Sequence, residues 1–121
     1  MKLKIKESSW SGWSKDYKPN TKEQVYDITL NEKYIIKTSK ISYIRGGKII
    51  KEEIEDFSFE IIEINSDNIK IKTFQSFSDN DNGTINLLSD KKEFIIYYES
   101  VLELRTPTTD VGDIYYLTLI K

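Results

Sequence analysis

The sequence contains no cysteine, no histidine and no alanine among its 121 residues. Without cysteine the chain has no disulfide framework, no zinc–thiolate site and no thiol nucleophile. Without histidine it lacks an imidazole base and the ordinary ligand of zinc, copper and haem. These absences exclude serine–histidine and cysteine–histidine hydrolases, and we expect neither a cofactor nor a metal site.

A surplus of charge and long apolar runs are missing as well. The 18 Lys and Arg residues nearly balance the 20 Asp and Glu residues, which leaves a net charge of −2. Nucleic-acid binding needs a surplus of basic residues on one face, so nucleic acid is not an expected partner. No apolar run is long enough for a signal peptide or a membrane span. We therefore expect a cytoplasmic chain without membrane contact, although a trimmed secretion signal would leave no trace here.

The residues that are present favour strands. Isoleucine is abundant, and 8 Tyr and 5 Phe accompany it; such side chains suit a pleated, half-buried surface. Polar residues alternate with Phe57, Phe59 and Ile61, as expected of a strand with one face on a core. The alternation slips after Ile61, which predicts a β-bulge. Residues 114–120 are mostly apolar on both faces, which predicts a central strand.

Turn signals separate these segments. Gly46 and Gly47 predict a two-residue hairpin turn, because both central positions of such a turn need positive φ. Residues 65–68 are rich in Asn and Asp and predict another turn. We predict one all-β domain over 1–121, an antiparallel meander of about eight to ten strands that forms a small barrel or a two-sheet sandwich.

Three parts of the chain leave alternatives open. We expect residues 7–23 to be irregular. Residues 48–57 fit a strand slightly better than one short amphipathic helix, although apolar residues recur there at helical spacing. Segments such as 94–98 are apolar on both faces, which indicates either a second layer or a homodimer.

Two groups of residues could form a binding surface. Trp10, Trp13 and Tyr17 lie in one polar loop and could stack on a sugar ring, or else plug one end of the sheets. Residues 52–63 contain six acids and no base. This acidic stripe could steer a basic protein partner, or else be an ordinary solvated face. Its first four acids are the predicted partner-binding residues: Glu52, Glu53, Glu55 and Asp56.

Elimination then favours a binding function. We expect a non-catalytic protein-binding module with a protein partner, such as a bacterial immunity or inhibitor protein. The alternative is a β-domain that binds a small ligand or carbohydrate through its aromatic loop. An enzyme is not expected, because paired carboxylates are the only catalytic groups left and some pair among 20 acids arises by chance.

Overall fold

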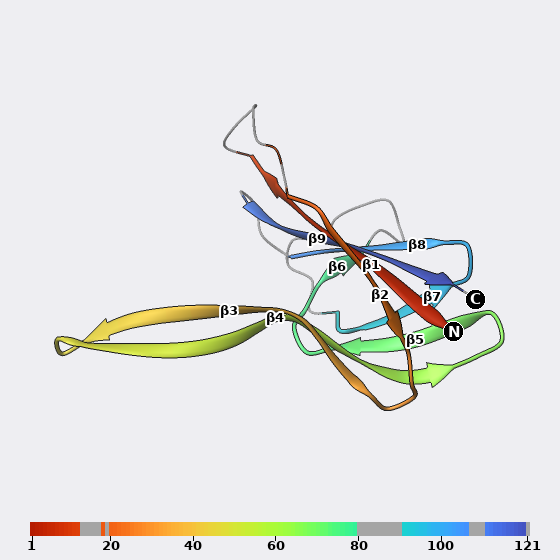
Figure 1. The fold of residues 1–121 in the computed structure, drawn as a ribbon, viewed down its shortest axis with the longest axis horizontal. Helices are drawn as coiled ribbons and strands as arrows, with labels where there is room; N and C mark the ends of the chain where they lie inside the picture. The colour runs from red at the N-terminus through yellow and green to blue at the C-terminus, as the bar shows by residue number, and fades with distance from the viewer. Residues whose placement is uncertain (13–17, 19, 80–90, 107–110, 121) are drawn as a thin grey trace.

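The computed structural model describes residues 1–12, 18, 20–79, 91–106 and 111–120. Within these ranges the chain forms nine strands and no helix, in two antiparallel sheets. The all-β prediction is confirmed, and of its two forms the sandwich is correct and the closed barrel is not. Figure 1 shows the two sheets and a long hairpin that leaves them.

The five-stranded sheet has the order β2-β1-β9-β8-β6, and the four-stranded sheet has the order β3-β4-β5-β7. The strands of the first sheet are β1 (Lys2–Ser11), β2 (Lys22–Asp27), β6 (Ser78–Asp79), β8 (Val101–Arg105) and β9 (Val111–Ile120). Those of the second are β3 (Lys33–Arg45), β4 (Lys48–Ile64), β5 (Asn68–Thr73) and β7 (Glu93–Tyr97).

The topology departs from a simple meander at the ends of the chain. β9 pairs with β1 along ten residue pairs, from Lys2 opposite Ile120 to Ser11 opposite Val111. This pairing makes β9 the middle strand of its sheet, as its two apolar faces predicted. The first and last strands therefore close the sheet together, which no local sequence signal specifies.

The core lies between the two sheets. Its buried side chains come from alternate positions, with Leu3 and Ile5 on β1 and Phe57, Phe59 and Ile61 on β4. An aromatic group joins the layers, because the Phe57 ring of one sheet lies 4.2 Å from the Tyr115 ring of the other, centroid to centroid. Burial of such rings supplies much of the hydrophobic stabilisation of a small sandwich.

Two local predictions are confirmed. Gly46 and Gly47 form the β3–β4 turn with φ values of 57° and 78°. The β4–β5 register shifts between Ile61 and Glu63, at the predicted bulge. Ile64 then faces the buried Ile69 of β5 across the ladder.

One alternative and one expectation fail. At 48–57 the favoured strand is correct and the short helix does not form, because these residues pair with β3 through the Gly46–Gly47 turn and β4 begins at Lys48. The segment 7–23 is not irregular at its ends, because β1 continues to Ser11 and β2 begins at Lys22. Pairing with β9 and β1 extends both strands.

Candidate functional site

The most prominent feature outside the sandwich is the far part of the β3–β4 hairpin, which projects well beyond the two sheets (Figure 1). We define the arm as residues 38–45 and 48–55. Its ladder runs from Thr38 opposite Glu55 to Arg45 opposite Lys48. β5 pairs with β4 only from Phe59 onward. Among the described strands, then, those of the arm pair only with each other, and both outer edges present unpaired backbone groups.

The base of the arm is marked by two β-bulges. The β3–β4 register shifts on either side of Lys37, so that Ile36 is an extra residue on β3 and Asp56 is an extra residue on β4. A bulge bends a strand and increases its twist. One bulge on each strand preserves the pairing on both sides of the base while the hairpin changes direction away from the sandwich.

The tip of the arm is apolar and basic. The Ile44 side chain is 78% exposed, the highest value among the exposed large hydrophobic residues. Arg45 and Lys48 flank the turn and are exposed too. None of the side chains that the structure describes in the arm, at 38–40, 44–45, 48 and 52–55, is buried. An isolated two-stranded hairpin is only marginally stable in water, so these residues give the arm little support.

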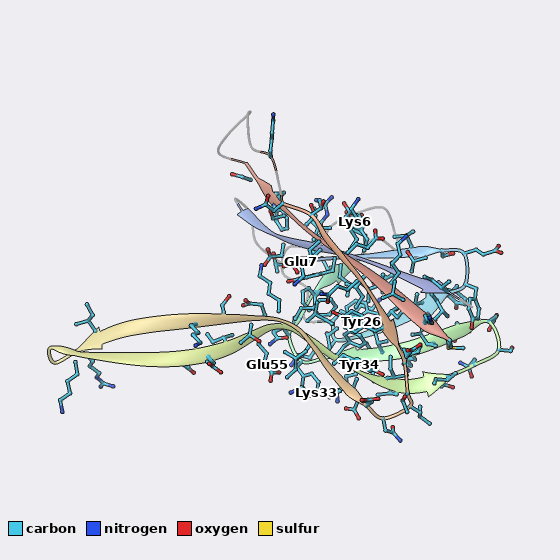
Figure 2. All side chains as sticks on the ribbon, in the orientation of Figure 1. Lys6, Glu7, Tyr26, Lys33, Tyr34 and Glu55 are labelled. Carbon is cyan, nitrogen blue, oxygen red and sulfur yellow. The ribbon has the colours of Figure 1, made fainter. Side chains whose placement is uncertain are left out.

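The four predicted partner-binding acids lie along the arm and at its base. Glu52 and Glu53 are exposed on the arm, and Glu53 pairs with Lys40 of β3 at 3.5 Å. Glu55 pairs with Lys33 at 2.9 Å, and Figure 2 shows these two side chains together where the arm meets the sandwich. Asp56 accepts a hydrogen bond from the Ser39 hydroxyl.

Lysines of β3 thus interrupt the acidic stripe that the sequence of β4 predicted. The hydrogen bonds from Lys33 and from the Ser58 hydroxyl, in that order, hold the pKa of Glu55 below its ordinary value. The arm therefore carries mixed charge, with bases at the tip and acids toward the base.

An ion-pair cluster that sequence analysis did not identify lies beside the base. The Lys37 ammonium is 2.9 Å from Asp113 Oδ1 on β9 and 3.5 Å from Glu7 Oε1 on β1. Burial lowers the pKa of Lys37, but its hydrogen bond to Asp113 and the two negative charges outweigh burial and raise that pKa overall. The only sequence signal was Glu7, which continues the inward alternation of Leu3 and Ile5 with a polar residue.

Tyr115 lies next to this cluster and is fully buried. Its hydroxyl oxygen has no hydrogen-bond partner among the described residues. Desolvation first, and then the negative charges of Asp113, Glu7 and Asp56, raise the pKa of Tyr115 far above its ordinary value. The phenol therefore stays neutral and serves the core rather than proton transfer.

Of the predicted aromatic loop, the structure describes Trp10; Trp13 and Tyr17 lie outside the described residues. Trp10 is opposite Gly112 in the β1–β9 ladder and is partly buried. A Cβ atom at Gly112 would lie 2.2 Å from the Trp10 ring, so the indole covers the glycine backbone closely. Arg105 lies over the same ring, 5.7 Å from its centroid.

A second surface feature is a hollow of about 560 Å³ along β7 and the start of β8. Its volume falls within the range of small-ligand sites. Ile95, Tyr97 and Val101 line it together with Lys70 and Glu93, whose charged groups are 4.0 Å apart. Trp10, the described residue of the predicted aromatic loop, does not line this hollow.

Comparison with known proteins leaves the site to be interpreted from its own geometry. No family model, curated protein or solved structure matches this chain. Within the described ranges, no helix has the length and apolar character that a membrane crossing requires. Nor do the described acids converge in a group of three that could hold a metal ion.

Proposed function

We propose that this chain is a non-catalytic protein-binding module and that the arm is its contact element. The observation that carries the proposal is a hairpin with two unpaired edges and an Ile44 side chain 78% exposed at its tip. Unpaired strand edges bind other chains by strand addition, and natural proteins normally block edges that have no partner. A partner would supply the coverage that the sandwich does not give the arm.

The charges of the arm suit recognition of a protein. Exposed ion pairs such as Lys40–Glu53 contribute little to folding, with side chains 72% and 68% exposed. Separate basic and acidic regions, as on the arm, instead help to fix the register and orientation of a bound chain. Immunity and inhibitor proteins, which bind a toxin or an enzyme without catalysis, fall within this proposal.

A small-ligand or carbohydrate function has less support. Trp10 packs on Gly112 and under Arg105, so a sugar would have to displace Arg105 to stack on that side of the indole. Among the described residues that line the hollow along β7, Tyr97 offers the one exposed aromatic ring, so a sugar would lack a second ring on which to stack.

The test compares two isoleucines of β3. The native chain, an Ile44→Asp variant and an Ile35→Asp variant serve as parallel baits in an extract of the producing cells. Ile35 is also exposed, at 54%, but lies outside the arm. Each retained protein is then purified and titrated against the three chains.

We expect the Ile44→Asp variant to bind at least about tenfold more weakly than the native chain, because a buried carboxylate would replace an apolar contact. The Ile35→Asp variant should bind normally. A partner that tolerates Ile44→Asp and is lost with Ile35→Asp, or the absence of any protein retained through the arm, would refute the proposal.

A further inference from the structure

We infer that the partner of the arm is a second copy of this chain, paired along the outer edge of β4. The inference rests on the proposed function, because it takes the arm as the contact element and names what binds there. The open edge begins at Lys48, directly after the turn. It ends before Ser58, whose carbonyl oxygen accepts a hydrogen bond from the Phe74 amide at 3.1 Å.

Symmetry restricts how two such edges can pair. Identical strands related by a twofold axis perpendicular to the sheet run antiparallel, and opposite residues alternate between hydrogen-bonded and non-hydrogen-bonded pairs. An axis midway between two residues would relate a hydrogen-bonded pair to a non-hydrogen-bonded pair, which symmetry forbids. The axis must therefore pass between a residue and the same residue of the second copy. The window 48–56 fills the open edge and is centred on Glu52.

This register is complementary in charge. It places Lys48 opposite Asp56 of the second copy and Lys51 opposite Glu53, and the twofold axis repeats both pairs. Ile50 and Ile54 also face each other. Opposite-charge and apolar cross-strand pairs stabilise sheets, so four charge pairs and two apolar pairs favour this arrangement. The unmatched pairs are Ile49 with Glu55, which the axis repeats, and Glu52 with its own copy.

Neighbouring registers match fewer pairs. An axis through Glu53 matches only Lys51 with Glu55, and it places Ile50 opposite Asp56. An axis through Lys51 pairs Ile50 with Glu52 and Ile49 with Glu53, which matches no opposite charges. Self-pairing along β3 about Ser42 would place Lys40 opposite Ile44. The order of bases before acids in β4 therefore favours this edge and this register.

The arrangement also suits the shape of the chain. Two antiparallel arms form a four-stranded ribbon with β3 on each outer side, and the two sandwiches lie at its opposite ends. Three or more strands are far more stable than a lone hairpin, so pairing would order the arm. Because two strand edges bury a small area, we expect weak association that depends on concentration.

The first experiment uses the absence of cysteine from the chain. A Glu52→Cys variant carries one thiol, which the proposed register places opposite its own copy. Opposite Cα atoms in antiparallel sheets are about 4.5–5.5 Å apart, within disulfide range. A Lys40→Cys variant carries an exposed thiol on β3 as the control. At low micromolar concentration under mild oxidation, we expect at least about tenfold more covalent dimer from Glu52→Cys.

The second experiment reverses charges in the full chain and follows self-association by sedimentation equilibrium. Lys51→Glu and Glu53→Lys should each weaken dimerisation by about tenfold, because each creates two like-charged pairs across the axis. The double variant should restore it. Restoration is diagnostic, because the double variant still lacks the Lys40–Glu53 pair within its own arm.

The two proposals can fail separately. A chain that stays monomeric up to about millimolar concentration, or equal crosslinking at residues 40 and 52, overturns the self-pairing. The proposed function then stands if an Ile44-dependent protein is captured. A dimer that is unaffected by both charge reversals would place the dimer contact away from the outer edge of β4 and overturn the self-pairing. If no protein is captured through Ile44 either, the proposed function falls as well.

Discussion

Lys37 Nζ lies 2.9 Å from Asp113 Oδ1, and this contact joins the two sheets at the base of the arm. Lys37 sits between the two bulges of the β3–β4 ladder, whereas Asp113 belongs to the middle strand of the other sheet. Of the described ion pairs, those of Lys37 alone connect one sheet to the other. They fix the strand from which the arm departs.

Replacing Lys37 tests the energetic weight of this connection. The Glu7 and Asp113 side chains are about three-quarters buried, and in Lys37→Met their carboxylates lose the cation that pairs with them. We expect a loss of about 1–2 kcal/mol in the free energy of unfolding, measured by urea denaturation. Lys40→Met removes an exposed pair and should cost less than about 0.5 kcal/mol. Equal losses would show that the cluster is merely a surface pair.

The buried hydroxyl of Tyr115 predicts a stabilising substitution. Its oxygen has no partner among the described residues, so Tyr115→Phe removes an unsatisfied polar group and should stabilise the chain by about 1 kcal/mol. Tyr34→Phe is the control, because the Tyr34 hydroxyl donates to the Asp27 carbonyl at 3.0 Å and accepts from the Thr29 amide at 2.9 Å. That variant should lose about 1 kcal/mol. Destabilisation by both would contradict the assignment.

The raised pKa values of Lys37 and Tyr115 predict the effect of alkaline pH. A group whose pKa is higher in the folded chain binds more protons there, so folding loses stability as pH rises above the unfolded pKa. These two groups should contribute nothing to the pH dependence between about pH 7 and 9, and a decline should begin near pH 10. Denaturant titrations across this range should show a shallower decline for Tyr115→Phe. An unchanged slope would refute this origin.

The contact between Trp10 and Gly112 predicts a steric conflict. A methyl group at residue 112 would meet the Trp10 ring at 2.2 Å and Thr106 Oγ1 at 2.3 Å. We expect Gly112→Ala to cost about 1–3 kcal/mol and to shift tryptophan fluorescence, because the indole must move. In a Trp10→Ala background the added cost should be smaller, as a double-mutant cycle will show. Strict additivity would mean that the indole does not cover Gly112.

Local sequence patterns correctly predicted the parts of the fold that depend on near neighbours. The alternation of Phe57, Phe59 and Ile61 matches their complete burial, and the slip after Ile61 matches the bulge. The double glycine predicted the β3–β4 turn, because only positive φ closes a two-residue hairpin without strain. The same patterns did not exclude a helix at 48–57, because the apolar residues there recur at spacings that fit both a strand and a helix.

What the sequence determined by itself is therefore the strand class, the inward faces and the turns, all of which follow from steric preferences within a few residues. The tertiary structure decided where the strands of the long hairpin leave the core, because β5 covers β4 only from Phe59 onward. It also decided the Lys37 cluster, whose Asp113 contact joins residues 76 positions apart. No periodicity encodes such pairings, since they depend on which strands meet after the two sheets have packed together.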